Sequence, residues 1–177
     1  MPLKIVVTGP ESSGKTTLCT QLSERYKGTM IPEFARAYLH DINHAYTFQD
    51  IENIGVGQFE RNRKDFQNKG VMVCDTDAIS SIIWAEEKFS KKSPILENCS
   101  RKEAANLYIL CSPDLLWQSD PLRENPLDRD RLFKIYLNHL QQLSLPFVII
   151  SGIGGIRLNC ASFFINNLFP EFRKFAI

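Results

Sequence analysis

A glycine-rich segment near the start of the chain constrains the fold more than any other part of the sequence. Residues 9–16 read GPESSGKT and match the pattern G-x-x-x-x-G-K-[ST]. They follow a β-branched apolar run at 3–8 and precede a segment with helical spacing at 16–27. In this context the backbone N–H groups of the loop converge on the phosphates of a nucleotide. The segment therefore predicts a P-loop that follows a buried strand.

The rest of the chain alternates between apolar runs typical of strands and segments with helical spacing. Strands are expected at 3–8, 29–31, 71–74, 107–111 and 147–150. Helices are expected at 16–27, 34–39, 48–68, 78–89, 131–143 and 159–168. This alternation predicts βαβ units and right-handed crossovers. We expect one α/β domain over residues 1–177, a three-layer P-loop NTPase fold with a mostly parallel five-stranded sheet, like that of nucleoside and nucleotide kinases.

Composition and charge exclude several classes of protein. The 177 residues include 21 Lys and Arg and 20 Asp and Glu, so the balance gives no reason to expect nucleic acid or an anionic membrane as a partner. The apolar runs are too short to span a bilayer, and the first residues lack the form of a signal peptide. The five cysteines form no C-x-x-C pattern. We expect a cytoplasmic protein, and leave its oligomeric state open.

The phosphate loop and the third strand supply the predicted nucleotide and magnesium contacts. Lys15 can reach the β- and γ-phosphate oxygens, and the hydroxyl of Thr16 can bind Mg²⁺. Asp75 ends a buried strand, where a carboxylate can hold Mg²⁺ directly or through water. The predicted nucleotide-binding residues of the loop are Gly9, Ser12, Ser13, Gly14, Lys15, Thr16 and Thr17. The sequence shows no guanine-reading Asn/Thr-Lys-x-Asp element, which favours ATP over GTP.

Two further carboxylates follow predicted strands, and each has alternative roles. Glu33 can accept the proton of an attacking hydroxyl, while Arg36 on the same helix face can bind a phosphate or orient that carboxylate. The alternative is a surface i,i+3 ion pair without a catalytic role. Asp77 either positions a substrate hydroxyl or caps the helix that begins at Ala78. We predict Glu33 as a catalytic and substrate-binding residue, and Arg36 and Asp77 as further substrate contacts.

A segment rich in Arg, Asp and Pro, which we call the lid (residues 112–130), separates the fourth and fifth strands. Such a segment is often a solvated loop. In phosphoryl transfer, however, a lid brings cations to the transferring group and excludes water. We predict Arg123 as a catalytic residue and Arg129 as a nucleotide contact. Trp117 either anchors the lid or belongs to the core.

Four motifs occur in order along the chain: GPESSGKTT at 9–17, PEFAR at 32–36, DTD at 75–77 and W-x-x-D-x-x-R at 117–123. Together they resemble the ribosylnicotinamide kinase domain of the NadR family, over roughly residues 3–157. The resemblance implies ATP- and Mg²⁺-dependent phosphorylation of the 5′-hydroxyl of nicotinamide riboside, in NAD salvage.

The resemblance also suggests roles for the matched residues. Lys15 and Thr16 would contact the triphosphate, and Arg123 would act in the lid. Glu33 or Asp75 would activate the acceptor hydroxyl. The nicotinamide ring needs an aromatic neighbour, for which the candidates are Phe34, Phe59 and Trp84.

The features of the sequence favour a small-molecule kinase with a nucleoside as its partner. Two alternatives remain: a P-loop kinase for another nucleoside or nucleotide, and a regulatory switch that binds and slowly hydrolyses ATP. The alternatives differ in whether nucleotide turnover needs a small acceptor, because a switch hydrolyses ATP without one.

Overall fold

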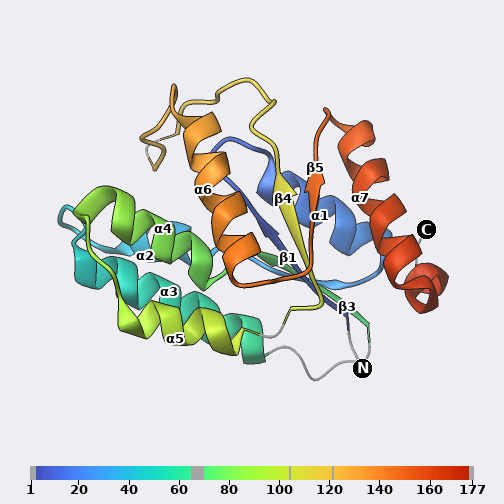
Figure 1. Ribbon diagram of the computed structural model, residues 1–177, viewed down its shortest axis with the longest axis horizontal. Helices are drawn as coiled ribbons and strands as arrows, with labels where there is room; N and C mark the ends of the chain where they lie inside the picture. The colour runs from blue at the N-terminus through green and yellow to red at the C-terminus, as the bar shows by residue number, and fades with distance from the viewer. Residues whose placement is uncertain (1–2, 65–69, 104, 121, 176–177) are drawn as a thin grey trace.

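A five-stranded parallel sheet forms the centre of the molecule (Figure 1). The computed structural model describes residues 3–64, 70–103, 105–120 and 122–175. The strand order is β2-β3-β1-β4-β5, and all four neighbouring pairs are parallel. The strands are β1 (Leu3–Thr8), β2 (Thr29–Ile31), β3 (Val71–Asp75), β4 (Leu107–Cys111) and β5 (Phe147–Ile150). The predicted P-loop fold class is confirmed, with a sheet that is parallel throughout.

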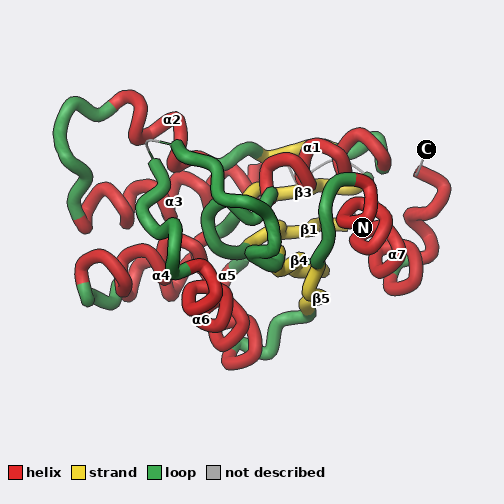
Figure 2. Tube along the Cα trace, turned by 90° about the horizontal axis from the view of Figure 1, so that it is seen from above, coloured by secondary structure: helices red, strands yellow, loops and turns green. Residues whose placement is uncertain are grey.

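Helices cover both faces of this sheet. They are α1 (Lys15–Arg25), α2 (Phe34–Asp41), α3 (Phe48–Lys64), α4 (Ala78–Phe89), α5 (Pro94–Lys102), α6 (Arg129–Gln142), α7 (Gly155–Leu168) and the short 3₁₀ helix η1 (Pro170–Phe175). Seen from above, the strands lie between α1 on one side and α4 and α6 on the other (Figure 2). Among the described residues, no helix has the length and apolarity that a bilayer crossing requires.

The three central strands are apolar on both faces because helices cover both. Alternate residues of β1 face opposite sides: Ile5 packs with α1 and α7, whereas Val6 packs with α4 and α6. All residues of β1, β3 and β4 are buried. This burial fixes the carboxyl ends of β1 and β3 side by side, in the register Val7 with Asp75. The functional residues after these strands therefore meet at one edge of the sheet.

Several helix boundaries differ from the predictions. The helix α5 was not expected, although Ser93 caps it by accepting a hydrogen bond from Leu96 N, and Pro94 occupies its first turn. Helix α7 begins at Gly155, before the predicted start at residue 159, and α6 begins at Arg129, before the predicted start at residue 131. Residues 65–68 of the predicted 48–68 helix lie outside the described residues.

Candidate nucleotide-binding site

The phosphate loop joins β1 to α1 and depends on its glycines. Gly9 has φ of 134°, and a Cβ there would lie 2.8 Å from the carbonyl oxygen of Cys111. Gly14 has φ of 77° and is the N-cap of α1. A side chain at Gly9 would clash with the neighbouring strand. At both positions, the positive φ would strain the backbone of any residue other than glycine. The loop thus leads directly into the N-terminus of α1, where backbone N–H groups favour an anion.

Lys15, Thr16 and Asp75 meet beneath this loop. The Thr16 hydroxyl donates a hydrogen bond of 2.6 Å to Asp75 Oδ2, and Asp75 Oδ1 is buried without a hydrogen-bond partner. Lys15 Nζ donates to the carbonyl oxygen of Pro10 at 2.9 Å. Burial raises the pKa of Asp75, while the charge of Lys15 and the Thr16 hydrogen bond oppose this shift.

The pair of Thr16 and Asp75 fits a magnesium ion. Both residues offer oxygen, which Mg²⁺ prefers, and the unpartnered Asp75 Oδ1 needs a ligand or donor. Among the residues described here, no group of three or more His, Cys, Asp or Glu side chains could hold a metal. A magnesium ion at this place would therefore complete its coordination with phosphate and water oxygens.

Glu33 lies at the N-cap position of α2 and lines the same cavity as Lys15. Burial raises the pKa of Glu33, and the positive charge of Lys15 acts in the opposite direction. Arg36 also lines the cavity, but its guanidinium pairs with Asp120 of the lid at 3.1 Å. Arg36 thus joins α2 to the lid through Asp120, which lies 84 positions away in the sequence. From the sequence we had considered only a local ion pair of Arg36, with Glu33.

Asp77 is the N-cap of α4, which was one of its two predicted roles. Its Oδ1 accepts a hydrogen bond from Ile79 N at 3.1 Å, and its Oδ2 accepts one from the Tyr108 hydroxyl at 2.9 Å. Burial raises its pKa to about 7. Asp77 is fully buried and is not among the residues that line the cavity. Its position therefore favours the capping role over contact with a substrate.

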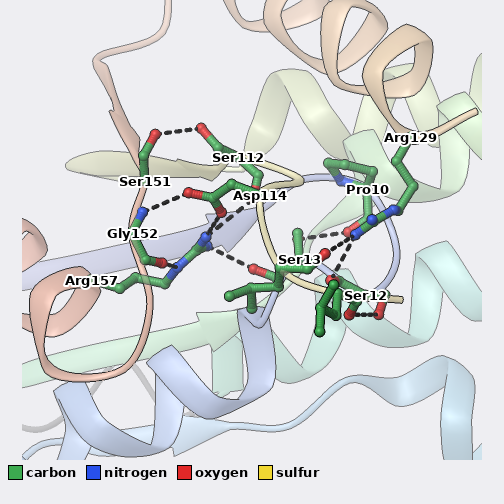
Figure 3. Close-up of polar contacts among 11 residues, drawn as sticks. Pro10, Ser12, Ser13, Ser112, Asp114, Arg129, Ser151, Gly152 and Arg157 are labelled. Carbon is green, nitrogen blue, oxygen red and sulfur yellow. Dashed lines mark hydrogen bonds and ion pairs between the residues drawn. The ribbon is translucent and has the colours of Figure 1, made fainter. Parts of the chain in front are cut away.

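The lid lies against the phosphate loop. Arg129, which the structure places in the first turn of α6, donates to the carbonyl oxygens of Ser12 at 3.2 Å and Leu115 at 2.9 Å. These contacts are drawn in part in Figure 3. The Arg129 guanidinium also lies 5.9 Å from the ring centroid of Trp117. Trp117 therefore packs against the arginine that anchors the lid to the phosphate loop. Arg129 contacts the loop backbone and is not among the residues lining the cavity.

Arg123, the predicted catalytic arginine, does line the cavity. Its Nη1 donates to the carbonyl oxygen of Gln118 at 2.6 Å, and its Nη2 lies 4.0 Å from Asp120 Oδ2. The side chain is held within the lid, close to the cavity wall.

Glu11, inside the phosphate loop, was not predicted as a site residue. Its carboxylate accepts hydrogen bonds from the backbone N–H groups of Glu124 at 2.9 Å and Asn125 at 2.6 Å. Ser12 Oγ accepts another from Gln118 N at 3.0 Å. The sequence around Glu11 does not indicate these contacts, because the partners lie more than 100 residues away.

Arg157 of α7 is a second residue that the sequence analysis missed. It is buried, and its guanidinium donates to the carbonyl oxygens of Ser13 at 2.7 Å and Ser112 at 3.2 Å (Figure 3). It also forms an ion pair with Asp114, whose other oxygen accepts from Gly152 N at 2.6 Å. Arg157 thus connects the phosphate loop to the segments after β4 and β5.

The cavity has a volume of about 680 Å³. It extends from the phosphate loop toward α4, where Tyr46 and Trp84 form an aromatic wall with ring centroids 5.0 Å apart. Of the three aromatic candidates, Trp84 lines the cavity and Phe59 is buried. Phe34 is not among the lining residues, and the guanidinium of Arg61 lies 4.4 Å from its ring centroid.

The chain resembles known proteins in both sequence and structure. Residues 4–156 match the model of a protein family described as an AAA domain. A curated relative from Salmonella typhimurium, the "Trifunctional NAD biosynthesis/regulator protein NadR", is 25% identical over 152 residues. Its counterpart from Escherichia coli is 25% identical over 154 residues. Each alignment covers 81% of this chain and 37% of the relative, so the chain spans less than half of their length.

Solved structures support the same fold. A crystal structure of a NadR protein in complex with NR superposes with a TM-score of 0.82 at 22% identity, and covers 96% of this chain and 52% of that one. A thymidylate kinase from Ehrlichia chaffeensis gives 0.64 at 14% identity, with 92% and 98% covered. The resemblance to NadR inferred from the four motifs is confirmed. This chain is a P-loop domain with the fold of nucleotide kinases, and it belongs to the AAA domain family.

Proposed function

We propose that this protein is an ATP-dependent kinase that phosphorylates the 5′-hydroxyl of nicotinamide riboside. The observation that carries this proposal is that Glu33, Lys15 and Thr16 line one cavity, and that Thr16 is hydrogen-bonded to Asp75. A carboxylate, a cation and a potential magnesium site thus surround the position that the terminal phosphate would take. The curated NadR relatives and the NadR structure with NR support the choice of acceptor.

The residues divide the work of phosphoryl transfer among them. Lys15 would exchange its hydrogen bond with Pro10 for one with the β- and γ-phosphates. Thr16 and Asp75 would hold Mg²⁺, which neutralises charge on the phosphate oxygens. Arg123 would approach the transferring group from the lid, and stabilise the charge that develops there.

Glu33 is our candidate for the general base. Burial raises the pKa of its carboxyl, which makes the carboxylate a stronger base for the hydroxyl proton. The acceptor oxygen forms a bond to the γ-phosphorus, and the bond from that phosphorus to the bridging oxygen of ADP breaks. The hydroxyl proton passes to Glu33. Asp75, the alternative base, is fully buried and bonded to Thr16, which favours the magnesium role for it.

Charge in the acceptor part of the cavity favours a nucleoside over a nucleotide as the acceptor. Three of the cations that line the cavity pair with carboxylates: Arg36 with Asp120, Lys88 with Glu124 at 2.6 Å, and Arg131 with Glu87 and with Asp128 at 2.6 Å. A monophosphate acceptor would compete with these carboxylates for the same arginine and lysine side chains. An uncharged or cationic nucleoside faces no such competition, and its ring could contact Trp84.

The test is ADP release from Mg-ATP by purified protein, with and without nicotinamide riboside. Stimulation by the riboside, and a product heavier by one phosphate, would support the proposal. The Lys15→Ala variant serves as the blank. Stimulation by another nucleoside would reassign the acceptor. Nucleotide turnover that no acceptor in a nucleoside panel stimulates would contradict a kinase and favour the regulatory switch.

A further inference from the structure

We propose that Glu124 of the lid is a positioning residue that couples nucleotide binding in the phosphate loop to the aromatic wall of the acceptor pocket. Its backbone contacts one wall of the cavity, and its side chain contacts the other. The inference rests on the proposed function for its biological meaning, because it concerns the two substrates of that reaction.

The backbone of Glu124 is bound to the phosphate loop. Two successive N–H groups, of Glu124 and Asn125, donate to the carboxylate of Glu11 at 2.9 and 2.6 Å. Hydrogen bonds to an ionised acceptor are shorter and stronger than those between neutral groups. Glu11 belongs to the loop that would surround the phosphates. The position of this part of the lid therefore depends on the position of Glu11.

The side chain of Glu124 is bound to the acceptor wall. Its Oε1 accepts from the Tyr46 hydroxyl at 2.9 Å, and its Oε2 accepts from Lys88 Nζ at 2.6 Å. Tyr46 in turn accepts from Trp84 Nε1 at 3.3 Å, and the two rings meet edge to face. All of these side chains line the cavity. Glu124 therefore orients the aromatic pair that would face the ring of an acceptor.

A bound triphosphate would act on this connection through its charge. It brings several negative charges to the loop that carries Glu11, and like charges repel strongly where water is partly excluded. If the Glu11 carboxylate shifts, the backbone of Glu124, which donates a hydrogen bond to it, shifts as well. The side chain of Glu124 then moves Tyr46, and Tyr46 moves Trp84. Coupling of this kind is reciprocal, so an acceptor at the aromatic wall also changes nucleotide affinity.

The two tryptophans of the chain, Trp84 and Trp117, provide a direct test. Trp117→Phe leaves Trp84 as the sole tryptophan. This protein is titrated with a non-hydrolysable ATP analogue and Mg²⁺, without any acceptor, to saturation measured by calorimetry. We expect the emission of Trp84 to change on nucleotide binding. Addition of Glu124→Gln should abolish this change, because the amide keeps the backbone contact with Glu11 but loses the charge that holds Tyr46 and Lys88.

Glu97→Gln is the matched control. Its side chain is 40% exposed, against 43% for Glu124, and it pairs with Arg101 on α5 at 3.8 Å. Glu97 is not among the residues lining the cavity. In the Trp117→Phe background this control should keep the full response of Trp84.

The outcomes separate this inference from the proposed function. A Trp84 response that persists in the Glu124→Gln variant would overturn the coupling. So would the lack of any Trp84 response when nucleotide saturates the Trp117→Phe protein. Riboside phosphorylation without a Trp84 response would contradict the coupling alone. A response that Glu124→Gln abolishes, in a protein that phosphorylates no nucleoside, would support the coupling and contradict the kinase.

Discussion

The phosphate loop and the lid both contact the cavity, but they are held in different ways. The loop follows the fully buried strand β1, and the buried Arg157 binds its backbone. Arg157 also binds the first residues of the lid, but the described residues of the lid are exposed or half-buried, and the rest of it is held by hydrogen bonds and ion pairs such as that between Asp120 and Arg36. Buried contacts resist local opening, whereas exposed ion pairs contribute little to stability. The comparison suggests a rigid nucleotide site covered by a lid whose opening requires little free energy.

The largest expected effect is that of a change in the phosphate loop. Lys15→Ala should lower riboside-dependent ADP release by about a thousandfold, because it removes the cation that we propose to contact the transferring phosphate. Thermal unfolding of the variant should stay close to that of the parent, since Lys15 bonds a loop carbonyl rather than the core. Steady-state kinetics and a melting curve check both parts. A large loss of stability would contradict the comparison.

Glu33→Gln should lower kcat by about a hundredfold or more, the usual contribution of a general base. In the parent, activity should fall as pH drops through the pKa of Glu33. Because burial raises this pKa, the acid limb should lie above the ordinary range for glutamate. A pH profile of kcat/KM tests this expectation. An unchanged acid limb in Glu33→Gln would transfer the role of base to another carboxylate.

Arg157→Met should destabilise the protein by about 2–3 kcal/mol, because it leaves buried carbonyl groups and Asp114 without their partner. Urea denaturation measures the effect. The exposed Arg101→Met is the control, and it should change the free energy of unfolding by less than about 0.5 kcal/mol. Equal effects of the two variants would mean that Arg157 does not brace the loop.

The smallest effect is expected in the lid. Asp120→Asn removes the partner of Arg36, and should raise the KM for the acceptor by at most about fivefold, the range expected of an exposed ion pair. The difference from the parent should shrink as salt is added, because salt screens such pairs. Kinetics at low and high ionic strength provide the measurement. A large, salt-independent effect would show that the lid is as firmly fixed as the loop.

The sequence predicted much of the fold because its signals are local. The five strands were expected close to their observed positions, since each is a short apolar run with clear ends. Helix α5 was missed although Ser93 and Pro94 form a recognisable start signal, because the polar residues before it resembled a loop. The start of α7 was missed because glycines usually indicate a turn.

The candidate site was predictable to the extent that it follows strands. The residues after β1, β2 and β3 were identified, because the carboxyl ends of parallel strands share one edge of the sheet. Asp77 had two predicted roles, and the structure shows the contacts that favour one of them: it caps α4 and accepts a hydrogen bond from Tyr108. The partner of Arg36 was not predictable, because Asp120 is 84 residues away in an irregular segment.

By itself the sequence determined the phosphate loop, the strand–loop–helix unit around it and the order of the motifs along the chain. These features depend on backbone geometry and on the spacing of neighbouring residues. The tertiary structure alone decided that Glu11 binds the lid, that Arg157 supports the loop from α7, and that Glu124 meets Tyr46. Hydrogen bonds and ion pairs between distant segments form only after packing brings their partners within about 3 Å, and no local pattern in the chain encodes that distance.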